Sequence, residues 1–304
     1  MSPARLRLPP PVWVLMFGST CWGLTWIWLK HIETLGVGPV LLSTIAYGAQ
    51  FLLCLPWVWP QFRRWRHRPD ERPIALHWLL LLALLSGVSG IGFTVAMVYG
   101  DVIRSILLFF LLPAWGVLMG HVFLREALSL QRIVTLTLAL IGAFTLLAPD
   151  LTLGFKPADL AALGAGLALA AANVLFRYLQ NEPMVVKLSV MQLGGAVFGL
   201  LIWLLLPESL DRLTLNGLAQ SALYGVTLLL AAMIATQYAV ERLPAGRSSV
   251  LMTLELVVAS GTALWIGHEH PSLWVWLGGG LIVAAALIEA NTHSIGAAPG
   301  DGHA

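Results

Sequence analysis

The chain has 304 residues, of which 58% are apolar and only 11% charged, whereas soluble domains carry about 25% charged residues. A water-soluble fold of this composition would expose large apolar patches, so lipid must be the solvent for much of the surface. The net charge is +2. Without a long basic run interleaved with aromatic residues, nucleic acid is excluded as an expected partner.

A membrane-crossing helix needs about 20 mostly apolar residues, and ten such stretches follow one another along the chain. They are residues 11–30, 38–59, 78–99, 103–124, 130–148, 158–178, 185–206, 216–239, 247–267 and 272–290. We expect helices because lipid offers no partners to backbone polar groups. Residues 291–304 should form a disordered C-terminal tail. The sequence therefore predicts an all-α polytopic membrane protein.

The distribution of basic residues predicts the orientation of the spans. If the N-terminus is cytoplasmic, 13 of the 17 Lys and Arg residues fall on the cytoplasmic side, as the positive-inside rule requires. The N-terminal stretch superficially resembles a signal peptide, but Lys30 and His31 follow it in place of a small-residue cleavage site. We expect a multi-pass protein of the inner (plasma) membrane with both termini in the cytoplasm.

A shift of 143 residues superposes informative positions of the two halves. Arg104-Ser105 falls on Arg247-Ser248, and Glu126 falls on Glu269. Each half holds five spans, an odd number, so the second half must be inverted relative to the first. The predicted domains are a first repeat at 1–150 and a second at 151–290. Inverted repeats are typical of secondary transporters, with the substrate site near the midplane between them.

Several motifs resemble those of the drug/metabolite transporter superfamily, EamA type. The first span has Trp22-Gly23 followed by Lys30. The fourth span has Leu112-Pro113 and ends with Leu124-Arg125-Glu126-Ala127-Leu128. The second half repeats this pattern with Leu254-Glu255 and Gly267-His268-Glu269, and Arg242-Leu243-Pro244-Ala245 is also typical. The resemblance covers residues 12–290 and implies export or exchange of small metabolites or amino acids.

Two positions depart from this resemblance. The family often has Arg eight residues after the Pro of the second span, whereas here Pro39 leads to Tyr47. The Pro expected in the second half is replaced by Leu256. The anion-recognition role of the second-span Arg therefore does not carry over to this chain.

Glu255 is the only carboxylate deep within any predicted span. A charge at that depth costs a few kcal/mol, so it should face a partner or a cavity. It could bind a substrate ammonium, titrate as a proton-coupling group, or pair with a cation. A protonated or hydrogen-bonded packing residue is the structural alternative.

Aromatic and basic residues near the predicted cavity are the other candidates. Trp22 and Trp26 are four residues apart and share a helical face, and Tyr99 and Trp115 lie in spans that line the cavity in this family. We assign Trp22, Trp26, Tyr99, Trp115 and Glu255 to substrate binding, with packing as the alternative for the aromatics. Lys30 and Arg104 either snorkel to the interface or meet a substrate carboxylate at the outer mouth.

No metal or cofactor is expected, since the histidines form no zinc pattern and no ATP-binding motif is present. The expected partners are a small-molecule substrate, membrane lipid and, as a candidate, a proton; the oligomeric state stays open. The leading function is a secondary transporter exporting amino acids or similar amphipathic solutes by alternating access. The alternatives are a membrane enzyme acting on a lipid-linked substrate and a passive channel.

Overall fold

The computed structural model describes residues 10–66, 76–124, 129–147, 156–179, 182–240, 242 and 245–295, which form helices joined by short connections. The helices are α1 (Pro11–Thr34), α2 (Pro39–Arg66), α3 (Leu76–Tyr99), α4 (Val102–Phe109), α5 (Leu112–Leu124), α6 (Leu130–Leu147), α7 (Pro157–Tyr178), α8 (Met184–Leu205), α9 (Leu215–Tyr224), η2 (Gly225–Leu229), α10 (Leu230–Val240), α11 (Ala245–Trp265) and α12 (Leu273–Ile295). Glu126 and residues 296–304 of the predicted tail lie outside the described residues.

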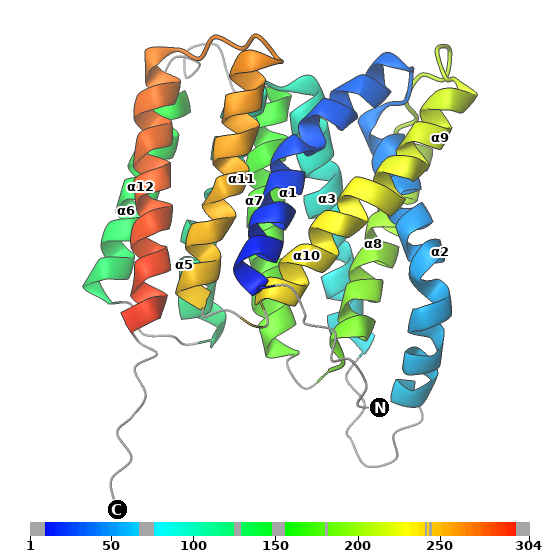
Figure 1. Cartoon of the computed structure of the whole chain (residues 1–304), viewed down its shortest axis with the longest axis horizontal. Coiled ribbons are helices and arrows are strands. Elements are labelled where there is room, and N and C mark those ends of the chain that lie inside the picture. The colour runs from blue at the N-terminus through cyan, green and yellow to red at the C-terminus, as the bar shows by residue number, and fades with distance from the viewer. Residues whose placement is uncertain are drawn as a thin grey trace, which may run out of the picture.

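Seven helical segments of the described chain are long and apolar enough to cross a membrane, and three further apolar helical stretches are shorter. These ten segments coincide with the ten predicted spans, so the prediction of an all-α polytopic membrane protein is confirmed. The last helix differs in length, because α12 continues to Ile295, beyond the predicted end at 290. α1 begins and α12 ends at the same end of the bundle (Figure 1).

Two of the predicted spans are interrupted. The fourth consists of α4 and α5, separated at residues 110–111, where Leu111 N–H bonds to the Leu108 carbonyl in a tighter turn. Pro113 follows and has no N–H to donate, which favours an interruption of the helix at this point. The eighth contains the π-helical segment η2 between α9 and α10. Segments of this kind are frequent at functional sites.

The two halves of the chain are interleaved. α1 from the first half packs against α10 and α11 from the second, α6 packs against α12, and α3 packs against α7 and α8. In Figure 1, α6 and α12 form one edge of the bundle, and α2 and α9 the other. Contacts between the halves therefore run through the whole described part of the bundle.

A fully buried apolar part of the core lies at one end of the bundle, which we call the upper end. It is the end where α2, α4, α7, α9 and α12 begin, at the top of Figure 1. Six apolar side chains from α1, α4 and the α1–α2 connection are at most 3% exposed there: Leu29, Ile32, Val37, Val102, Ile103 and Ile106. The described residues thus close the bundle at its upper end with apolar packing.

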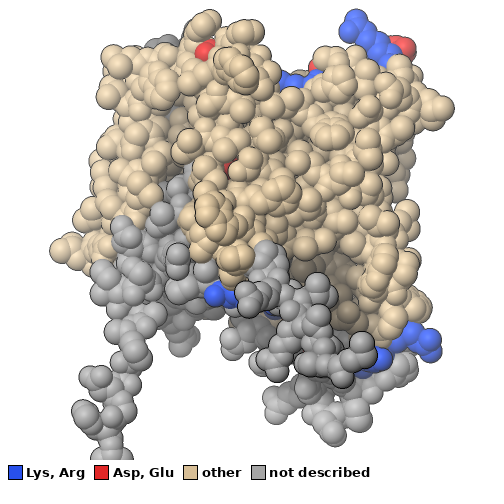
Figure 2. All heavy atoms as spheres, in the orientation of Figure 1, with Lys and Arg blue, Asp and Glu red and all other residues tan. Residues whose placement is uncertain are grey.

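Charged side chains avoid the middle of the bundle surface. Figure 2 shows Lys and Arg atoms at the upper and lower margins of one face, with an almost entirely uncharged surface between them. Large apolar side chains are exposed on the described helices, among them Trp57, Phe144 and Val257, which are 66–68% exposed. Such a belt matches the hydrocarbon region of a bilayer.

Candidate functional site

Glu255 lies at the midpoint of α11, which runs from Ala245 to Trp265. Its side chain is 7% exposed, whereas Val257, two residues further on, is 66% exposed. Residues two apart on a helix point about 200° away from each other. The Val257 side faces the surrounding medium, so Glu255 points into the bundle.

α1 packs closely against α11 at the position of Glu255. A Cβ on Gly23 would lie 2.8 Å from the Glu255 carbonyl oxygen and 2.8 Å from Val258 Cβ. Only glycine allows the two backbones to approach this closely, as in other membrane helix pairs. Glu255 therefore stands where the first helix of the first half meets the second half.

The Glu255 carboxylate makes no hydrogen bond or ion pair within the described structure. A buried charge without a partner is costly in a membrane, and buried polar groups in proteins are normally satisfied. Glu255 is therefore buried in the bundle without the partner that a carboxylate at such a position normally has, and its role in substrate binding stays a prediction.

The tryptophans of α1 connect it to both neighbouring helices. Trp22 Nε1 donates to Thr236 Oγ1 of α10 at 3.1 Å. Trp26 Nε1 donates to Thr262 Oγ1 of α11 at 3.0 Å, and its ring is buried. The sequence did not identify either threonine, because nothing in the local sequence indicates that its hydroxyl accepts a hydrogen bond from a tryptophan of another helix. The interhelical bonds fix the two rings on either side of the Gly23 contact, and their role in substrate binding stays a prediction.

The other two predicted aromatics lie in different surroundings. Trp115 on α5 is half-buried against the main core, and its Nε1 is buried without a hydrogen-bond partner in the described structure. Tyr99 ends α3 at the upper end and is 63% exposed. Trp115 thus joins the interior group and Tyr99 does not; for both, contact with substrate stays a prediction.

Tyr47 occupies a slot between two helices. A Cβ on Gly90 of α3 would collide with the Tyr47 hydroxyl end, and a Cβ on Gly195 of α8 would lie 2.8 Å from its ring. The missing side chains of these two glycines make room for the ring. Position 47, where the resemblance described above would suggest an Arg, is thus filled here by a neutral aromatic side chain.

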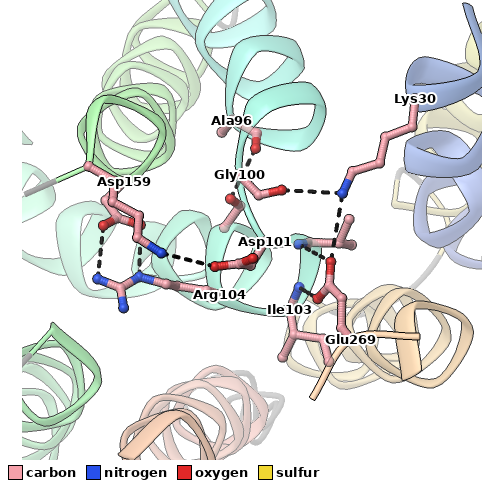
Figure 3. A network of polar contacts seen from close by, with 11 residues as sticks. Lys30, Ala96, Gly100, Asp101, Ile103, Arg104, Asp159 and Glu269 are labelled. Carbon is pink, nitrogen blue, oxygen red and sulfur yellow. Dashed lines mark hydrogen bonds and ion pairs between the residues drawn. The ribbon is translucent and has the colours of Figure 1, made fainter. Parts of the chain in front are cut away.

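An ion pair at the upper end joins α4 to α7 (Figure 3). Arg104 Nε and Nη2 donate to the two carboxylate oxygens of Asp159, each at 2.8 Å. The two side chains are 8% and 2% exposed. Snorkelling to the interface therefore does not account for Arg104, and Asp159, in the first turn of α7, is a partner that sequence analysis missed.

Glu269 links the second half to the first at the same end. Its two carboxylate oxygens accept from the N–H groups of Val102 at 2.6 Å and Ile103 at 3.0 Å, at the start of α4. Lys30 Nζ lies 3.8 Å from Glu269 and donates to the Gly100 carbonyl at 3.3 Å (Figure 3). A carboxylate at a helix N-terminus satisfies free donors and is favoured by the helix dipole. We call this group of contacts the Glu269 latch.

A second glutamate makes the same kind of contact nearby. Glu208, in the α8–α9 connection, accepts from the N–H groups of Val40 and Leu41 at 3.0 Å each, at the start of α2. Both glutamates belong to the second half and both bind helix starts of the first half. The upper end is therefore held by polar contacts between the halves as well as by the apolar core.

A pocket of about 320 Å³ opens beside the latch, lined by Asp101, Arg104, Lys156, Glu269 and His270 among others. Its charges are already paired, since Lys156 also bonds to Asp101 at 3.3 Å. Among the described residues, no group of three or more His, Cys, Asp or Glu side chains is arranged to hold a metal ion.

Its series of long apolar helices defines this molecule as a polytopic integral membrane protein. The EamA-like transporter family model matches residues 10–148 and 156–289. The chain therefore belongs to the EamA-like transporter family, within the drug/metabolite transporter superfamily, and the predicted resemblance is confirmed. Membership implies a membrane transporter of small solutes, built from two copies of one five-helix unit.

Comparison with solved structures supports the same fold. One crystal structure superposes with a TM-score of 0.59 at 16% sequence identity, over 95% of this chain and 99% of the other. At this identity the similarity concerns the fold alone. No curated protein matches the sequence.

Proposed function

We propose that the protein is a secondary transporter that exports a small amphipathic metabolite, such as an amino acid, by alternating access. The observation that carries the proposal is the Glu255 carboxylate, buried and unpartnered at the midpoint of α11, where α11 meets α1. Substrate sites of secondary transporters with inverted repeats lie near the midplane between the repeats. Trp22, Trp26 and Trp115 would form the aromatic part of the site.

The closed upper end supports alternating access. The Glu269 latch and the Glu208 contacts join the two halves there, so separating the halves would open the site on that side. Alternating access then requires that solute reach Glu255 from the opposite end while the upper end is closed. The inverted halves could exchange conformations at similar energy, which would produce the second state.

The charge distribution supports the orientation within the proposal. With both termini in the cytoplasm of a cell with an inner membrane, the upper end would face outward. We retain the repeat boundaries at 1–150 and 151–290 as part of this proposal. Lys30 and Arg104 would then lie at the outer mouth, where Lys30, the more exposed of the two, is the better placed to meet a departing anion.

Transport into liposomes tests the proposal. Purified full-length protein should move candidate amino acids and related solutes with saturable kinetics, and Glu255→Gln should change the rate or its pH dependence. Asp211→Asn is the matched control, because Asp211 is an exposed carboxylate in the α8–α9 connection. An active protein whose rate and pH profile are unaffected by Glu255→Gln would remove Glu255 from the mechanism.

The same experiment separates the two alternative functions. A membrane enzyme acting on a lipid-linked substrate would turn over that lipid without vectorial movement of solute. A passive channel would give rates that rise without saturation as the solute concentration increases.

A further inference from the structure

Which buried charged side chains lack a partner indicates what charge a bound substrate should carry. The described cationic side chains buried in the bundle already have partners. Arg104 is bound by Asp159 at the upper end. Lys187, near the start of α8, donates to the Phe176 carbonyl at 3.3 Å and lies 3.8 Å from the centre of the Phe176 ring.

The contact of Lys187 has its own structural explanation. Phe176 lies in the last turn of α7, where the free carbonyl groups and the helix dipole attract a cation. Lys187 therefore serves the end of a helix rather than the centre of the bundle. Lys30 is likewise engaged, with the Gly100 carbonyl and Glu269.

Among the buried charged side chains of the described residues, Glu255 is the one left without a partner. A cation entering the interior would find a carboxylate. A solute carboxylate would find the same negative charge and, among the described interior side chains, no free cation to offset it. Like charges brought together in a medium of low dielectric constant repel strongly.

The aromatic side chains around α1 favour the same kind of solute. The rings of Trp22 and Trp26 are fixed by their bonds to α10 and α11, and indole faces attract ammonium groups. At position 47, a neutral tyrosine ring fills the slot between Gly90 of α3 and Gly195 of α8, so this position supplies no positive charge.

We infer that the site selects its solute by an ammonium or other organic cation attached to an apolar body, and does not require a carboxylate. This inference rests on the proposed transport function and narrows its substrate class. Glu255 is the counter-ion of the cation, and the tryptophans contact the adjoining apolar part. An amine should therefore bind better than the amino acid that carries the same side chain.

Three compounds with one phenyl ring test the inference, because they differ in their charged groups. They are trimethyl(phenethyl)ammonium, phenylalanine and 3-phenylpropionate. Binding to the purified full-length protein is measured as thermal stabilisation, since a ligand of the folded state raises its stability. Uptake into proteoliposomes is measured in parallel. We expect the ammonium compound to bind at least tenfold more tightly than phenylalanine, and 3-phenylpropionate not to bind.

Two variants link the selectivity to Glu255. Glu255→Gln should weaken binding of the ammonium compound at least tenfold, and Glu255→Asp should preserve the preference for it. Unliganded melting curves of both variants show that they are folded. A Glu255→Gln protein that melts normally and still binds the ammonium compound as tightly as the parent would overturn the inference.

The remaining outcomes distinguish this inference from the transport proposal. Saturable uptake of phenylalanine without binding of the ammonium compound would refute the cation preference but would still support the proposed transport function. If none of the three compounds is bound or transported, both the preference for cations and the proposed class of amphipathic solute are refuted.

Discussion

The Arg104–Asp159 pair offers the sharpest test of how the upper end is held together. Asp159→Asn keeps the shape of the side chain but removes its charge, which leaves the Arg104 guanidinium buried without its counter-ion. Both side chains are less than 10% exposed and are joined by two bonds of 2.8 Å. Breaking a buried pair of this kind costs about 3–5 kcal/mol.

Thermal unfolding in detergent measures this loss. At about 2 °C per kcal/mol for a chain of this size, Tm should fall by roughly 6–10 °C. The control is Asp101→Asn, because Asp101 and its partner Lys156 are 60% and 52% exposed at a separation of 3.3 Å. An exposed pair contributes about 0–1 kcal/mol, so Tm should hardly change.

A double variant identifies the cause of the change. Arg104→Met combined with Asp159→Leu replaces both charges by apolar groups, and such replacement of a buried pair is often neutral. The double variant should therefore melt closer to the parent than Asp159→Asn does. Equal losses in Asp159→Asn and Asp101→Asn, or a double variant less stable than the single one, would refute the assignment of a buried, mutually dependent pair.

Three further predictions concern the latch, the α1–α11 contact and the orientation. In a background without the native cysteines, Glu269→Ala should speed labelling of a cysteine placed at Val102 by about 2- to 30-fold, because losing a cap costs about 0.5–2 kcal/mol; an unchanged rate would contradict a latch. Gly23→Ala should destabilise by roughly 1–3 kcal/mol through overpacking, whereas Gly261→Ala, with nothing within 4 Å of its Cβ, should not; equal Tm shifts would refute the close contact. A cysteine at Ser209 should react with an impermeant reagent outside intact cells, and labelling only in inverted vesicles would reverse the orientation.

The sequence allowed the spans and the duplication to be predicted because both depend on local composition and order. The ten apolar stretches were long enough to identify individually. The interruption at residues 110–111 also had a local signal in Pro113, although the fourth span was predicted as continuous. The π-helical segment had no comparable signal in the local sequence. Its packing against α2 depends on Gly225, where a Cβ would collide with the Ala46 backbone, and that contact is between distant parts of the chain.

The partners of the charged residues could not be predicted from the same information. Arg104 was identified as a candidate, but Asp159 lies 55 positions away, and Glu269 lies 167 positions from the Val102 N–H group that it binds. One sequence gives no indication of which distant residues meet. Glu255 was identifiable because its signal, a carboxylate in the middle of an apolar span, is entirely local.

The unpartnered carboxylate of α11 also has a consequence for biogenesis. An acidic residue at the centre of a helix adds about 2.5–3.5 kcal/mol to the free energy of insertion by the translocon. α11 should therefore insert into the bilayer poorly by itself. Its stable insertion should depend on α12 and on the already inserted α1, because α11 packs against both. Ribosome-bound chains that end before α12 should hold α11 in the membrane less completely than chains that include it.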